Sequence, residues 1–194
     1  MKEFSAFGLF VTFGAGLAIL AIYLNKRRND AWRAFAESMG LVGPAPGIFA
    51  SPVITGTHLG LDVQFDLETI GGGKNRQVFT RCAIRIPLVL PQGMVVSRES
   101  FFSGIDRFFG MQDIQTGEPE FDGKVIIKGS DPLAIKGYFS HPTRREAAEK
   151  IVLFSTRSRI EQNQVLLVQR GVVVDSAQLA ELLNSAVSTA RNLA

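Results

Sequence analysis

The sequence of 194 residues is long enough for one folded domain with an additional segment, and short for two domains of ordinary size. Its apolar content of 46% is typical of a chain with a packed core, which excludes wholesale disorder. A single cysteine, Cys82, excludes an intramolecular disulfide framework.

The net charge of +3 is located at the N-terminus. Residues 1–33 contain five basic and two acidic residues, whereas the rest of the chain contains 16 of each. A domain that binds nucleic acid usually has a basic excess in its folded part. We therefore expect no nucleic-acid partner.

Residues 4–24 form an uncharged, mainly apolar run of 21 residues. At a rise of about 1.5 Å per residue, a helix of this length spans roughly the 30 Å of a bilayer's hydrocarbon core. The alternatives are a buried core helix and a cleaved signal peptide. A core helix usually has a charged face, and a signal peptide has its basic cluster before the apolar run. The run therefore predicts an uncleaved transmembrane anchor over residues 1–25.

Basic residues cluster directly after the predicted anchor. Lys26, Arg27 and Arg28 follow the apolar run, whereas the residues before it carry no net charge. The positive-inside rule then places the C-terminal domain in the cytoplasm. Tyr23 and Trp32 flank this cluster, and their amphipathic rings favour the boundary between membrane and water. We therefore predict that these five residues lie at the membrane interface of a single-pass protein.

Residues 26–40 are expected to form a basic juxtamembrane helix. Trp32, Phe35 and Ala36 recur at helical spacing, and Gly40 is a suitable C-terminal cap. Two interpretations are open for this apolar stripe: it lies on the membrane surface, or it belongs to the first helix of the domain and is buried in the core. We favour the second.

Residues 41–194 are expected to form one globular domain, and its clearest strands flank a glycine-rich loop. Residues 62–68 and 78–86 alternate between apolar and polar side chains, which indicates a half-buried antiparallel pair. Burial of both apolar faces predicts that Phe65 lies opposite Cys82. The same register sets three further pairs opposite each other: Val63 and Ile84, Asp66 and Arg81, and Asp62 and Arg85.

The remaining elements indicate an α+β fold, in which the transmembrane helix precedes a largely antiparallel sheet, packing helices and a C-terminal amphipathic helix. Asp131 before Pro132 and Asp175 with Gln178 are N-terminal helix caps, and Thr143 with Glu146 reads as a capping box. The other expected elements are strands at 94–96 and 124–128, a short helix at 103–109, a buried hairpin formed by 165–168 and 172–174, and a final helix from 176 to 194.

No segment predicts catalysis or a cofactor. Residues 71–74 superficially resemble a phosphate-binding loop, but Asn75 follows the lysine where a hydroxyl residue is needed, and the segment joins two strands. His58 and His141 are isolated, so they do not form a zinc site. The acidic residues between 113 and 122 lack calcium-loop spacing, and the serines lack a nucleophile motif. We expect no catalytic, cofactor-binding or metal site.

A turn motif follows the middle of the domain: Gly117, Pro119, Phe121 and Asp122 lead into an apolar stretch and then to Asp131. This acidic-Pro-x-Phe-Asp turn resembles a motif of an uncharacterised family of bacterial membrane-anchored domains of unknown function. The aromatic segment after the anchor is similar to the opening of the same family. The resemblance implies a membrane-anchored architecture and a bacterial origin, and it implies no particular reaction.

Together these features predict a non-enzymatic interaction or scaffold module on the cytoplasmic face of a bacterial inner membrane. Its partners would be the lipid bilayer and a protein in the membrane or the cytoplasm. The alternative is a domain that binds a small molecule or a lipid at the membrane. An apolar pocket of several hundred Å3 with a few polar groups would favour the alternative.

Overall fold

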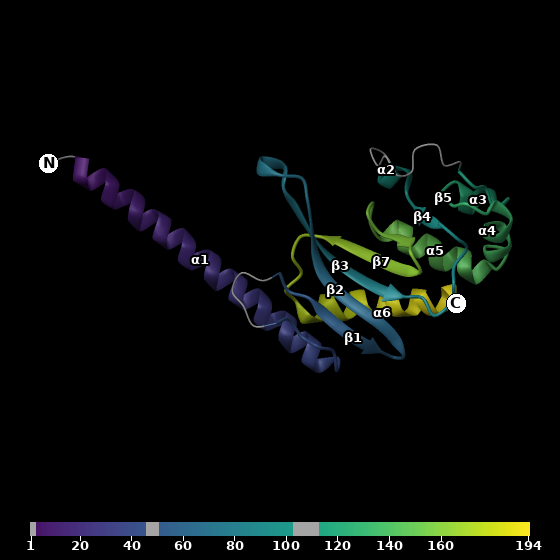
Figure 1. The fold of residues 1–194 in the computed structure, drawn as a ribbon, viewed down its shortest axis with the longest axis horizontal. Coiled ribbons are helices and arrows are strands. Elements are labelled where there is room, and N and C mark those ends of the chain that lie inside the picture. The colour runs from purple at the N-terminus through teal and green to yellow at the C-terminus, as the bar shows by residue number, and fades with distance from the viewer. Residues whose placement is uncertain (1–2, 46–50, 103–112) are drawn as a thin grey trace.

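The chain begins with α1 (Glu3–Ser38), a continuous helix of 36 residues that projects away from the rest of the protein (Figure 1). The computed structural model describes residues 3–45, 51–102 and 113–194, with side chains described from residue 15 onward. Downstream of α1, these residues form an α+β domain with one antiparallel sheet and a long C-terminal helix.

The sheet has seven strands in the order β1-β2-β3-β7-β6-β4-β5, and every neighbouring pair is antiparallel. The strands are β1 (Ile54–His58), β2 (Leu61–Ile70), β3 (Gln77–Arg85), β4 (Val95–Ser97), β5 (Ile126–Lys128), β6 (Arg159–Glu161) and β7 (Gln164–Arg170). β1 was not expected from the sequence. Its glycine and threonines weaken the apolar alternation that identifies a strand.

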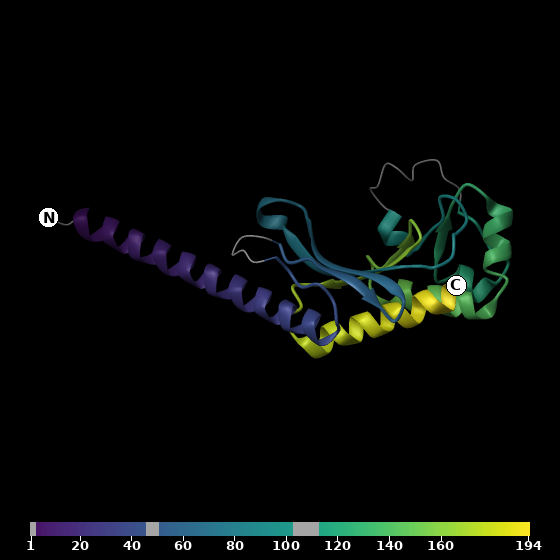
Figure 2. The same ribbon diagram turned by 60° about the horizontal axis from the view of Figure 1, so that its bottom comes forward.

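The helices lie mainly on one face of the sheet (Figure 2). α6 contacts β3, β7, α5 and α1, so it forms the centre of the helical layer. The elements besides α1 are a 3-10 turn, η1 (Gly73–Asn75), and the helices α2 (Glu99–Phe102), α3 (Pro119–Asp122), α4 (Pro132–Tyr138), α5 (Pro142–Phe154) and α6 (Ser176–Leu193).

The predicted register of β2 and β3 is confirmed. Phe65 pairs with Cys82 and Val63 with Ile84, and all four side chains are buried. A one-residue slip would have moved these side chains to the other face of the sheet, so burial selects the register. The polar faces also match as expected, with Asp66 opposite Arg81.

The last turns of α1 belong to the domain core. Trp32 and Phe35 are fully buried and pack edge-on against the ring of Phe65. The Trp32 indole donates a hydrogen bond of 2.7 Å to the Val173 carbonyl. Of the two interpretations for residues 26–40, burial in the core is therefore confirmed. The placement of Trp32 at the membrane interface is corrected, because its ring is enclosed by the domain.

The buried hairpin is formed by β6 and β7, not by residues 165–168 and 172–174 as the sequence suggested. Its turn consists of Gln162 and Asn163, both at positive φ (52° and 59°), the conformation that matches the twist of a two-residue hairpin. Asparagine tolerates this conformation better than most residues. The sequence pattern did not reveal this turn, because β6 has only three residues and is too short to show the alternation that marks a strand.

Two of the three predicted helix starts are confirmed. Asp131 caps α4 through the Ala134 amide, and the Asp175 carboxylate accepts hydrogen bonds at the start of α6. The capping box at Thr143 is wrong, because α5 begins at Pro142, whose fixed φ suits the first helical position. The helix expected at 103–109 lies outside the described residues.

Candidate functional site

The first candidate surface is the projecting part of α1. Each residue from 15 to 24 is exposed, on all sides of the helix. The large apolar side chains in this stretch are at least 39% exposed: Leu17, Ile19, Leu20, Ile22, Tyr23 and Leu24. No described part of the domain covers this surface, and an exposed apolar area of this kind is typical of a binding or membrane surface.

The structure describes side chains for only part of the predicted anchor. Among the described residues, no helix combines the length and the apolar character needed to cross a membrane. Residues 4–14, the first part of the predicted anchor, lie outside the region whose side chains are described.

The basic residues predicted for the interface follow this apolar stretch on the same helix. Lys26 and Arg27 are exposed, and Arg28 is partly buried and donates to Asn29 at 3.0 Å. Partial burial lowers the pKa of Arg28. The next residue, Asn29, is buried. Along α1, exposed apolar residues are therefore followed by basic residues and then by core residues, all within about three turns.

The turn motif of residues 117–122 has a structural role. The Asp122 carboxylate accepts hydrogen bonds from the Thr116 amide and hydroxyl and from the Gly117 amide, at 2.8 to 3.0 Å. These bonds hold the chain as it turns into α3. Pro119 occupies the start of α3, and the buried ring of Phe121 lies 5.3 Å from that of Phe139. The motif thus closes one end of the core, and none of its groups points to a ligand.

Two of the acidic residues in and near this motif are engaged in ion pairs. Asp113 pairs with Lys128 at 3.0 Å, and Glu118 pairs with Arg145 at 3.3 Å. Within the described ranges, no group of three or more histidine, cysteine, aspartate or glutamate residues could hold a metal ion. His58 and His141 lie on different elements, in β1 and just before α5.

The sheet face opposite the helices is charged. The predicted register implied this for β2 and β3, but the sequence reasoning missed the extension of this face to β6 and the turn before it. We call its ionic residues the charged face: Asp66, Glu68, Arg81, Arg157, Arg159 and Glu161. Asp66 pairs with Arg81 at 2.6 Å, and Arg159 pairs with Glu161 at 2.8 Å. The hydrogen bond to Asp66 raises the pKa of Arg81. The alternation of Arg157, Arg159 and Glu161 at every second position could have revealed this face.

The charged face is partly shielded from water. Arg159 and Glu161 are 6% and 8% exposed, and the Arg159 guanidinium stacks 4.8 Å above the ring of Phe101. Among the described residues, the Nε atoms of Arg157 and Arg159 have no hydrogen-bond partner. Because opposite charges neutralise each other here, the face is a structural layer rather than an anion-binding surface. Asp66 pairs with Arg81, as the predicted register requires.

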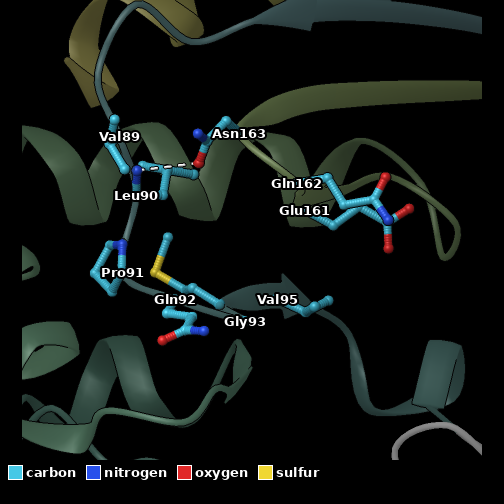
Figure 3. Close-up of a pocket in the computed structure, with 10 residues that line it drawn as sticks. Val89, Leu90, Pro91, Gln92, Gly93, Val95, Glu161, Gln162 and Asn163 are labelled. Carbon is cyan, nitrogen blue, oxygen red and sulfur yellow. Dashed lines mark hydrogen bonds between the residues drawn. The ribbon is translucent and has the colours of Figure 1, made fainter.

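A cleft opens where the loop from β3 to β4 passes the turn between β6 and β7 (Figure 3). Its volume is about 450 Å3. Apolar side chains come mainly from the loop and polar side chains from the turn; the lining residues are Val89, Leu90, Pro91, Gln92, Gly93, Met94, Val95, Glu161, Gln162 and Asn163. Its size and composition suit a small apolar ligand with a polar end.

The walls of the cleft are held by the turn. The Asn163 side chain accepts a hydrogen bond of 3.0 Å from the Leu90 amide, and its backbone carbonyl accepts one from the Ile86 amide. The loop is therefore fixed at its start and near its middle, while Val89 remains 82% exposed at the rim. The sequence offered no signal for this cleft, because its two walls are more than 60 residues apart.

Nucleophilic chemistry is not supported at Cys82. The thiol is fully buried, and burial raises its pKa, which keeps it protonated and unreactive.

The fold is similar to one solved structure, the crystal structure of the mycobacterial trehalose monomycolate transport factor A, TtfA. The TM-score is 0.50 at 14% sequence identity, and the match covers 87% of this chain and 91% of that protein. No family model matches the sequence, and a search of curated proteins finds no match. At this level of identity the similarity concerns the fold alone.

Proposed function

We propose that this chain is a membrane-tethered, non-enzymatic module whose domain lies on the cytoplasmic face of a bacterial inner membrane. The exposed apolar surface of α1 at residues 15–24 carries the proposal. Proteins in water seldom leave a helix apolar on all sides, whereas a bilayer solvates every side of it. Lys26, Arg27 and Arg28 follow directly and favour the cytoplasmic side.

The connection between α1 and the domain supports a scaffold rather than a loosely tethered binding domain. The helix continues without interruption into the core, where Trp32 and Phe35 are enclosed. A flexible linker would let the domain explore many orientations, but a continuous helix holds it in one. The domain would thus present a constant surface to a protein partner beside the membrane.

The structural neighbour is named as a transport factor for trehalose monomycolate, not as an enzyme. This name supports an accessory role at a membrane for a chain of similar fold. Two further observations are consistent with a protein that acts by binding: the charged residues on the sheet are paired with each other, and the thiol of Cys82 is buried.

Membrane extraction tests the anchor. The full-length chain should resist alkaline carbonate extraction, whereas the double variant Leu17→Lys, Leu20→Lys should be released. Each lysine at the centre of a membrane helix costs about 2.5–3.5 kcal/mol of insertion free energy. A matched control, Leu59→Lys with Leu133→Lys, changes exposed leucines of the domain and should stay in the membrane. Release of the unchanged protein by carbonate would refute the anchor.

A second candidate function is binding of an apolar small molecule or a lipid chain, and the cleft of about 450 Å3 favours it. A diazirine-bearing fatty acid added to membranes containing the full-length protein should crosslink to residues 89–93. Val89→Asp should reduce this crosslinking several-fold, while Val42→Asp, at a comparably exposed site elsewhere, should not. Equal crosslinking in both variants would exclude the cleft as the site.

A further inference from the structure

The hairpin of β2 and β3 extends beyond the sheet as a two-stranded arm, residues 69–78. β7 pairs with β3 only from Thr80 to Arg85, whereas β2 and β3 remain paired out to Ile70 and Gln77. The base of the arm is fixed by the Gly171 amide, which donates to the Val78 carbonyl at 2.8 Å. The arm is therefore an ordered two-stranded projection whose base is fixed to the rest of the domain.

The tip of the arm is a compact turn that requires glycine. Gly71 has φ +75°, and a Cβ atom there would lie 2.6 Å from the Asn75 carbonyl oxygen. The Asn75 amide donates to the Gly72 carbonyl at 3.1 Å and closes the turn η1. This turn carries Lys74 at its apex, with Arg76 two residues later.

The tip has a purely basic character. Residues 69–78 contain Lys74 and Arg76 and no acidic residue, and residues 71–77 are all exposed. Among the residues that the structure describes, no carboxylate forms a salt bridge with either side chain. Several other basic groups of the domain are neutralised, as in the pairs of Arg81 with Asp66 and Arg159 with Glu161. The tip therefore leaves two positive charges for an external partner.

The direction of the arm relates it to α1. In both views the tip and the projecting part of α1 lie on the same side of the domain (Figures 1 and 2). The direction of α1 is set by its buried end, where Trp32 bonds to the Val173 carbonyl. A membrane that contains the apolar part of α1 therefore lies on the side toward which the arm extends.

We propose that the tip of this arm docks on anionic lipid headgroups of the membrane that α1 enters, so that the domain is held at two points. The inference rests on the proposed membrane anchoring of α1. Each Lys or Arg near an anionic membrane surface strengthens the attraction about fivefold (about 1 kcal/mol). Docking at two points would fix the tilt of the domain about α1 and orient its remaining surfaces toward the cytoplasm.

The glycines suit this role better than a nucleotide site. A phosphate loop opens a helix whose N-terminus binds the phosphates, whereas this turn joins two strands. Without large side chains, residues 71–73 let the backbone and the two cations approach a headgroup layer closely. The attraction should also weaken in high salt, since the Debye length falls from about 10 Å at 0.1 M to about 3 Å at 1 M.

An environment-sensitive fluorophore on Asn75→Cys in the full-length protein tests the docking, because buried Cys82 does not react. The protein is placed in nanodiscs of phosphatidylcholine alone or with phosphatidylglycerol. We expect a blue shift of the emission only with phosphatidylglycerol. The shift should be lost when Lys74→Glu and Arg76→Glu are combined with the labelled Asn75→Cys, and also in high salt. The control Lys136→Glu, Lys150→Glu makes the same charge change on α4 and α5, remote from α1, and should keep the shift.

A second label separates failure of the docking from failure of the anchor. A fluorophore on Leu20→Cys should be quenched by nitroxide groups on lipid chains if α1 enters the bilayer. The docking alone would be overturned if the label at Leu20→Cys is quenched but the emission of the tip label does not change with phosphatidylglycerol. A tip signal that persists in the glutamate variant would also overturn it, because attraction to anionic headgroups requires the two cations. An unquenched label at Leu20 would overturn the anchor and the docking with it.

Discussion

Both faces of the sheet contain buried side chains, but of opposite kinds. On the helix-covered face, Phe65, Cys82 and Leu167 are at most 1% exposed and pack among apolar groups. On the charged face, Arg159 and Glu161 are nearly as buried and are paired with each other. The first face gains stability from every apolar group removed from water, whereas the second has to offset the desolvation of its charges.

This difference implies that the two faces respond differently to substitution. An apolar face loses stability in proportion to the volume removed, and it is disrupted when a charge is introduced. A paired charged face is most sensitive when one partner is removed and the other remains. Exposed pairs at the edge of the same face should be nearly neutral.

The largest effect is expected where a charge enters the helical layer. Leu183 is fully buried on α6, so Leu183→Asp combines a lost apolar contact with a buried carboxylate and should cost more than about 5 kcal/mol of unfolding free energy. Circular dichroism of the purified protein should show no cooperative unfolding transition. Leu133→Asp, at an 83% exposed position, should unfold like the unchanged protein. A normal transition for Leu183→Asp would show that α6 is not part of the core.

A smaller effect is expected at the end of α1. Trp32→Ala should lower the free energy of unfolding by about 3–5 kcal/mol, because it leaves a large cavity beside Phe65. Trp32→Phe retains most of the ring but leaves the Val173 carbonyl without its donor, which should cost about 1–2 kcal/mol. Urea denaturation in detergent measures both. If both variants match the unchanged protein, α1 is not built into the core.

Two ion pairs between β2 and β3 allow the buried part of the charged face to be compared with its exposed edge. Asp66 and Arg81 form two hydrogen bonds and are 12% and 30% exposed, whereas Asp62 and Arg85 lie 3.8 Å apart and are about 70% exposed. Asp66→Ala should therefore cost about 1–3 kcal/mol, and Asp62→Ala less than about 0.5 kcal/mol. Chemical denaturation of both variants tests the difference. Equal losses would show that burial does not distinguish the pairs.

A pH-dependent effect concerns a polar group within the helical layer. The Tyr138 hydroxyl donates to the Leu193 carbonyl, and burial raises its pKa to about 12 from an ordinary value near 10. The folded state then keeps the proton longer than the unfolded state, so stability falls as the pH rises from about 10 to 12. The loss should be about 1–2 kcal/mol, and Tyr138→Phe should lack this component. Parallel pH profiles for the two proteins would contradict it.

Local patterns determined a large part of this structure. The period of two in β2 and β3 sets their register, because a slip by one residue would expose Phe65 and Cys82. The caps at Asp131 and Asp175 and the apolar stripe of α6 depend on residues within one helix, so they can be recognised from the sequence. The apolar run of residues 4–24 likewise predicts an anchor without knowledge of the domain.

Only the tertiary structure decided which side chains meet across long separations. Trp32 is amphipathic and suits a membrane interface by its chemistry, but Val173 and Phe65, each more than 30 residues away, enclose it in the core. The partner of β7, the charged face and the cleft also depend on distant segments. Short-range periodicity reports which way a side chain points, and it carries no information on what lies opposite, because that is set by the packing of the whole domain.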